Sequence, residues 1–97
     1  MENKNINSKY RTEEEKKYLT KRLNVIEGQV RGIKQMIEND RNCEEIIMQM
    51  SAINKSLKSL SNNIIKNYLS NHIIDDIKNN KLESIDEVFS LFEIVNK

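Results

Sequence analysis

The stretch TEEEKKYLTKRLNVIEGQVRGIKQMIEN, residues 12–39, sets the fold of this 97-residue chain. Its apolar side chains recur at alternating intervals of four and three residues, the pattern of a helix packed nearly parallel or antiparallel to a neighbour. They are Leu19, Leu23, Ile26, Val30, Ile33 and Ile37. Thr12 and Glu15 have the spacing of a capping box, in which each side chain accepts a hydrogen bond from the other residue's backbone N–H. We therefore predict a helix from Thr12 to about Asn39.

A second helix with the same pattern follows a break at residues 40–42. Asn42 and Glu45 repeat the cap spacing. The next apolar residues are Ile46, Met50, Ile53, Leu57, Leu60 and Ile64. No proline interrupts this helix, so we predict that it continues to about Lys78, where two asparagines stop it. A helix of roughly 50 Å is too long for a compact three-helix monomer, so we expect at least an antiparallel dimer.

A short third helix is predicted near the C-terminus, where Ser84 and Glu87 again have cap spacing. Its apolar face is Ile85, Val88, Phe89, Phe92 and Val95. The chain has no Trp, no Pro, two Gly and 5% aromatic residues, a composition that favours long helices over sheets and turns. We predict an all-α fold of two long antiparallel helices plus a short C-terminal helix.

The chain is short enough to form one domain. Residues 1–11 are polar without an apolar period and are predicted to be a flexible arm, which leaves residues 12–97 as a single helical domain. No apolar run approaches the roughly 20 residues of a membrane span, and the N-terminus does not resemble a signal peptide. We expect a cytoplasmic protein.

Charge is distributed unevenly. Residues 1–72 hold 13 Lys and Arg against nine Asp and Glu, whereas residues 73–97 hold three against six. This basic excess fits a polyanionic partner only if the basic side chains share one face, because an ordinary mixed surface gives similar numbers.

Cys43 and His72 are the only cysteine and histidine, and they are the softest metal ligands available. Along one helix they are about 43 Å apart, so one chain cannot bring them together. Two antiparallel chains can, and any site that uses both residues is expected at a subunit interface. A single histidine leaves little scope for acid–base catalysis, and no catalytic motif is evident, so we do not expect an enzyme or a small-molecule substrate.

The stretch RLNVIEGQVRGIKQMIENDRNC, residues 22–43, closely resembles the first-helix signature of the copper-sensitive operon repressor family, and the resemblance continues through QMSAI at residues 49–53. This family contains repressors that respond to copper, nickel or cobalt, formaldehyde, or persulfides. The resemblance implies a homotetramer, built as a dimer of antiparallel dimers, that binds operator DNA without a helix-turn-helix. An effector at intersubunit sites releases the DNA.

The resemblance also implies which side chains meet DNA. Arg22 falls on a family position linked to DNA binding, and the companions we predict are Lys21, Arg31, Lys34, Lys55 and Lys58. An arginine frequent in the family aligns with Ser59 here, where Lys58 is a substitute. Each lysine can equally be a solvated side chain with no role.

The effector site departs from that of the relatives. Copper-responsive members have a cysteine at the position of Cys43, then a histidine and a second cysteine where this chain has Tyr68 and His72. The persulfide type needs a cysteine at His72. The nickel and cobalt type needs a histidine at Tyr68 and another near the N-terminus, and the formaldehyde type needs a proline near the start, which this chain lacks. Glu87 aligns loosely with a carboxylate that couples the site to DNA release, although we favour a capping role with Ser84.

Three interpretations of the effector site follow. The leading one is Cu(I) held by Cys43 and His72 across the interface, with Tyr68 as a further ligand. The second is direct thiol chemistry at Cys43, because unpaired N–H groups in a first helical turn favour the thiolate. The third is a repressor whose metal response is lost or much weakened. From a different class, a helical oligomerisation module that does not bind DNA also fits the heptad pattern and the near-neutral charge.

Overall fold

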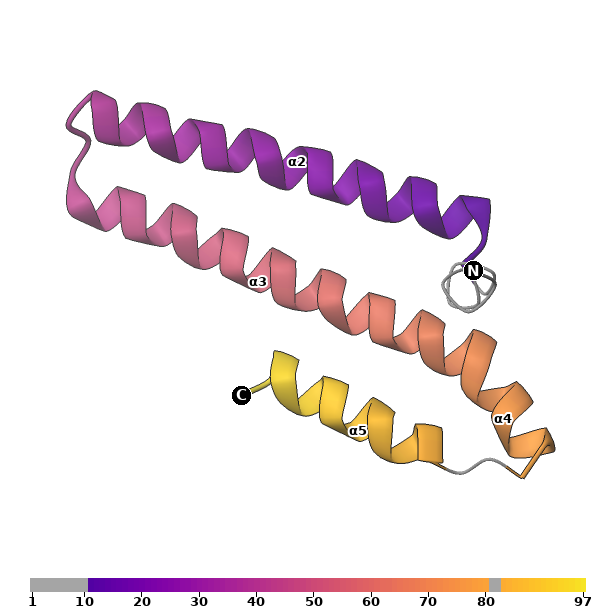
Figure 1. The fold of residues 1–97 in the computed structure, drawn as a ribbon. Coiled ribbons are helices and arrows are strands. Elements are labelled where there is room, and N and C mark those ends of the chain that lie inside the picture. Colours follow the sequence, from indigo (N-terminus) through magenta and orange to yellow (C-terminus); the bar gives the residue numbers. More distant parts are fainter. Residues whose placement is uncertain (1–10, 81–82) are drawn as a thin grey trace, which may run out of the picture.

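The computed structural model describes residues 11–80 and 83–97, with the backbone alone at residues 72–74 and 83–84. Its elements are helix α2 (Glu13–Glu38), helix α3 (Cys43–Tyr68), the π-helical segment η1 (Leu69–Ile73), helix α4 (Ile74–Lys78) and helix α5 (Glu83–Val95). Helices α2 and α3 form an antiparallel hairpin, and α5 packs along the C-terminal half of α3 (Figure 1). The predicted all-α fold is confirmed. The arm predicted at residues 1–11 lies outside the described residues apart from Arg11, and no helix in the described ranges is long and apolar enough to cross a membrane.

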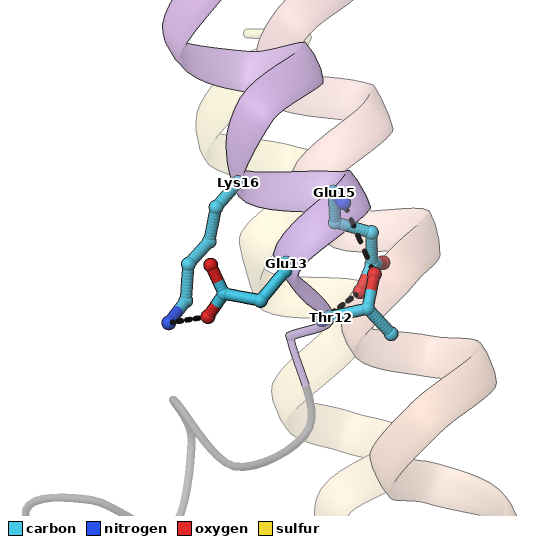
Figure 2. Close-up of polar contacts among 4 residues, drawn as sticks. All are labelled: Thr12, Glu13, Glu15 and Lys16. Carbon is cyan, nitrogen blue, oxygen red and sulfur yellow. Dashed lines mark hydrogen bonds and ion pairs between the residues drawn. The ribbon is translucent and has the colours of Figure 1, made fainter.

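The predicted capping box fixes the start of α2. Thr12 Oγ1 accepts a hydrogen bond from the Glu15 backbone N–H at 3.0 Å, and a Glu15 carboxylate oxygen accepts one from the Thr12 N–H at 2.7 Å (Figure 2). Glu13 in the same turn pairs with Lys16 at 3.1 Å. The acidic first turn also complements the positive end of the helix dipole. Local sequence is therefore sufficient to start this helix.

The turn between α2 and α3 forms where the break was predicted. Asp40 adopts a left-handed conformation with φ of 56°, which aspartate visits more readily than most residues. Asn42 then caps α3, because its side-chain oxygen accepts a hydrogen bond from the Glu45 N–H at 2.9 Å. Cys43 is consequently the first residue of α3.

The prediction of one continuous α-helix to Lys78 is wrong at residues 69–73, where the backbone becomes π-helical. Two side chains accompany the change. Ser70 Oγ donates to the Lys66 carbonyl oxygen at 3.1 Å, a back-bond that competes with the helical ladder and bends helices. Asn71 Nδ2 reaches across to the Glu15 carboxylate, 3.3 and 3.2 Å from its two oxygens. Contacts to the neighbouring turn and to α2 therefore override the α-helical propensity.

Helix α5 begins at Glu83, two residues before the start predicted from a cap at Ser84, so Ser84 lies inside the helix rather than at its cap. The face that meets α3 is also different from the predicted one. Val88 is buried against Ile65, with Tyr68, Ile85, Leu91, Phe92 and Val95 packed around this pair. Phe89, which we expected in the core, is 64% exposed. Leu91, which was not part of the predicted face, packs against Ile65 and Val88 instead.

The apolar seam of the hairpin divides into two sets. Leu19, Ile26, Ile53 and Leu60 are buried between α2 and α3 and form the core. The residues between them in the same four-and-three pattern, namely Leu23, Val30, Ile37, Met50 and Leu57, are 41–57% exposed. One chain thus covers only every second position of its seam. The remaining positions form an apolar strip on the hairpin surface, and a contiguous exposed apolar patch commonly marks an interaction site.

Candidate functional site

Cys43 presents its thiol at the outer end of the hairpin. It is exposed and free, and it follows the capping Asn42 directly. The neighbouring Arg41 is paired with Glu45 through two hydrogen bonds of 3.1 and 3.0 Å. The thiol is therefore open to a ligand or to a second chain, and no described residue of its own chain covers it.

His72 lies beyond the far end of the same long helix. Helix α3 alone extends over 26 residues, or about 39 Å, and His72 follows within η1. Its side chain lies outside the described residues. Within the part of the chain that the structure describes, no three His, Cys, Asp or Glu side chains gather as a metal site. A site that joins Cys43 to His72 therefore needs two chains.

The π-helical segment also changes the relation between Tyr68 and His72. The two residues are four apart in the sequence, a spacing that places two side chains on one face of an α-helix. That spacing holds for 3.6 residues per turn, whereas η1 has the i→i+5 hydrogen bonds of a π-helix. The spacing alone therefore does not place Tyr68 and His72 on one face.

Tyr68 is engaged with α5 rather than free for a metal ion. Its hydroxyl donates to Glu87 Oε1 at 2.7 Å, so Glu87 contacts Tyr68. The cap contact with Ser84 that we favoured involves a side chain outside the described residues. Burial, the hydrogen bond to Glu87 and the negative charges of Glu87 and Asp76 raise the pKa of Tyr68 to about 12. At neutral pH the phenol keeps its proton, which makes it a poor ligand for a soft ion.

This shift gives a first testable prediction, measured by ultraviolet absorption of tyrosinate. Tyr68 should ionise well after an ordinary tyrosine of pKa 10.0, at a pKa of about 12, and Tyr68→Phe should remove this late component. Because the pKa is raised in the folded state, the stabilising contribution of neutral Tyr68 is complete below pH 10 and disappears as the pH rises from about 10 to about 12. In denaturant all three tyrosines should titrate together. A late component that survives Tyr68→Phe would disprove the assignment.

The donors that remain fit a soft monovalent ion. One thiolate and one imidazole are the side chains that Cu(I) prefers, and a phenol is not. Cys43 is accessible, and Tyr68 is satisfied by Glu87. The chemistry of the donor set therefore suits a two-residue site shared between chains better than the three-residue site that includes Tyr68.

A polar groove with a basic lining runs along α3. Its lining residues are Lys55, Lys58, Ser59, Asn62, Asn63 and Lys66. The lysines are exposed, and none forms an ion pair with another described residue. Lys66 was missed by the sequence analysis, although the spacing 55, 58, 62 and 66 is that of one helix face. Three uncompensated positive charges on one face favour an external polyanion.

Arg22 lies next to this groove. Its Nη1 donates to the Tyr18 hydroxyl at 2.7 Å, and Asn63 Nδ2 donates to the same oxygen at 3.4 Å. The structure thus brings Arg22 together with the face that carries Lys55 and Lys58.

The other three predicted DNA contacts are not placed in that groove. Arg31 and Lys34 line a separate hollow on α2 together with Leu23 and Val30. Lys21 is exposed, and no described contact links it to either group. Five of the six predicted residues therefore lie on two surfaces of one chain, and Lys21 is linked to neither.

Comparison with known proteins gives consistent similarities. Residues 15–93 match the family described as metal-sensitive transcriptional repressor. The chain is 37% identical over 97 residues to the copper-sensing transcriptional repressor CsoR of Bacillus subtilis (strain 168), covering 99% of this chain and 94% of that protein. It is 42% identical over 57 residues to the copper-sensing transcriptional repressor RicR of Mycobacterium tuberculosis, covering 59% of each chain.

A solved structure gives the same result. The fold is similar, with a TM-score of 0.81 and 33% identity, to the crystal structure of the copper-sensing repressor CsoR with Cu(I) from Geobacillus thermodenitrificans NG80-2. The similarity covers 90% of this chain and 92% of that chain. Both the sequence and the arrangement of the helices are therefore those of the same group of proteins.

Proposed function

This chain belongs to the metal-sensitive transcriptional repressor family, and from that premise we propose that it binds operator DNA in the cytoplasm and is released by Cu(I). Residues 12–97 act as one helical unit in this proposal, and the role is regulatory rather than catalytic. The observation that carries DNA binding is the α3 groove, where Lys55, Lys58 and Lys66 have no anionic partner among the described residues and Arg22 lies at the edge.

DNA binding of this kind should depend steeply on salt. Contacts from lysine and arginine go mainly to phosphates, and each one releases counterions, so the logarithm of the affinity falls with the logarithm of the salt concentration. We expect a labelled duplex from the region upstream of the chain's own gene to be bound at low salt, measured by fluorescence anisotropy. Lys58→Ala and Lys66→Ala should each reduce the salt slope by about one.

Lys16→Ala is the matched control for these variants. Lys16 is an exposed lysine on α2 whose charge is paired with Glu13 at 3.1 Å, so its removal should leave the slope almost unchanged. No binding by the wild type at low salt would reject the repressor function and favour the helical oligomerisation module.

A second copy of the chain fits the exposed apolar strip of the hairpin. Leu23, Val30, Met50 and Leu57 lie on α2 and α3 at heptad-like intervals, and such a strip packs best against another helix pair. We propose an antiparallel dimer that buries this strip, with two dimers forming the tetramer of the family. Sedimentation at increasing concentration measures this association.

The effector site in this proposal is formed by Cys43 of one chain and His72 of the other. The two residues are too far apart to meet within one chain, and an antiparallel arrangement puts the start of α3 beside the end of its partner's equivalent helix. Cys43 would hold Cu(I) with its thiolate and His72 of the other chain would hold it with its imidazole, the donor types that this ion prefers. Tyr68 stays with Glu87, so it supports α5 and does not enter the ligand set. The similarity of this chain to copper-sensing repressors supports Cu(I) as the effector over nickel or an electrophile.

A further inference from the structure

Tyr18, Arg22 and Asn63 form a small polar cluster between α2 and α3. The Tyr18 hydroxyl oxygen accepts one hydrogen bond from Arg22 Nη1 at 2.7 Å and another from Asn63 Nδ2 at 3.4 Å. The Arg22 guanidinium carbon also lies 5.6 Å from the centre of the Tyr18 ring, within the range of a cation–π contact. One tyrosine therefore fixes the arginine through both its ring and its hydroxyl.

The contacts of Arg22 leave most of its binding capacity available. A guanidinium carries five N–H donors and no acceptor, and a single one is bonded to Tyr18. No carboxylate among the described residues pairs with Arg22. Its positive charge is therefore held in place by a neutral side chain without being neutralised, which is the arrangement expected of an arginine that awaits an external anion.

The cluster also determines where Arg22 points. Asn63 lines the α3 groove with Lys55, Lys58 and Lys66, and its amide is bonded to the same oxygen that holds Arg22. An arginine on α2 is thereby joined to a row of lysines on α3. Without the hydroxyl, the long side chain would sample many rotamers, and ordering it on binding would reduce the affinity.

We propose that Tyr18 is a positioning residue that presets Arg22 for a DNA phosphate, with Asn63 holding Tyr18 against the basic groove. This inference rests on the proposed DNA binding and adds a residue to it that carries no charge. The alternative is an ordinary surface contact at i,i+4 spacing that supports α2 alone. These two roles differ in what they affect, because the second changes helix stability and leaves DNA affinity unchanged.

A double-mutant cycle separates the two roles. Tyr18→Phe keeps the ring and removes the hydroxyl, and it should weaken binding of the upstream duplex roughly threefold to tenfold at fixed salt. Arg22→Ala should weaken binding more. In the Arg22→Ala background, Tyr18→Phe should have no further effect, because the hydroxyl acts through the arginine. Thermal unfolding of Tyr18→Phe should remain close to that of the wild type.

Arg41→Lys is the matched control, measured without effector. It disrupts a different i,i+4 contact of an exposed arginine, the pair with Glu45, while keeping the charge, and it should leave DNA affinity unchanged. Equal weakening by Tyr18→Phe in the wild type and in the Arg22→Ala background would overturn the positioning role. If the wild type binds the duplex and Tyr18→Phe binds it with the same affinity, the positioning role is also overturned. No binding by the wild type would instead overturn the proposed function, and this inference with it.

Discussion

Cys43→Ser is expected to abolish Cu(I) binding and to leave the affinity of the effector-free protein for DNA unchanged. Cys43 supplies the only sulfur ligand apart from methionine that the chain has, and a serine hydroxyl does not replace a thiolate for a soft ion. Cys43 is exposed at the first position of α3, where serine is well tolerated. Anaerobic titration against a Cu(I) chelator measures binding, and fluorescence anisotropy with the upstream duplex measures release of DNA.

His72→Ala distinguishes metal binding from thiol chemistry, since both depend on Cys43. Loss of the imidazole should weaken Cu(I) binding by at least the roughly 10-fold to 100-fold that removal of a supporting group already costs, while alkylation of Cys43 should proceed as in the wild type. If alkylation of Cys43 releases DNA and Cu(I) does not, the effector is an electrophile rather than Cu(I). Retention of tight Cu(I) binding by Cys43→Ser would place the site elsewhere.

The starts of α2 and α3 were predictable because their signals are local, whereas the same spacing at Ser84 and Glu87 misplaced the start of α5. Thr12 with Glu15, and Asn42 with Glu45, lie within three residues of each other, and each pair forms the hydrogen bonds that its spacing indicates. The packing of the two long helices against each other was also predictable, because the apolar spacing along each helix is visible in its own stretch of sequence. Which half of the seam is buried did not follow, because Leu19 and Leu23 read alike until the position of α3 is known.

The features that sequence could not give all depend on contacts between distant residues. The π-helical turn is accompanied by the bond between Asn71 and Glu15, 56 residues apart, and no local propensity encodes it. The bond between Tyr68 and Glu87 spans 19 residues. From the sequence alone, this bonded pair cannot be told from a tyrosine that is available as a metal ligand and a glutamate that is available as a helix cap. Lys66, in contrast, was open to prediction, because its spacing from Lys58 and Asn62 was already visible.

The second large effect is expected from installing the ligand types that the resemblance to copper-responsive repressors implies, with Tyr68→His and His72→Cys in one chain. A second thiolate and an imidazole give a softer donor set than the natural residues, so Cu(I) affinity should rise by more than the roughly 10-fold to 100-fold associated with a single supporting group. The double variant, titrated against the same chelator as the wild type, measures the gain.

The position of Glu87 favours this result, because it already accepts a hydrogen bond from residue 68. A histidine there can donate one ring N–H to Glu87 and leave its other nitrogen for the metal, an arrangement that fixes the tautomer of metal-binding histidines. Adding Glu87→Gln should therefore cost the double variant part of its gained affinity, whereas the wild type should lose little. An unchanged affinity in the double variant would mean that the turn at residues 69–73 keeps position 72 out of the site. The π-helical register, rather than the identity of the side chains, would then limit the affinity for Cu(I).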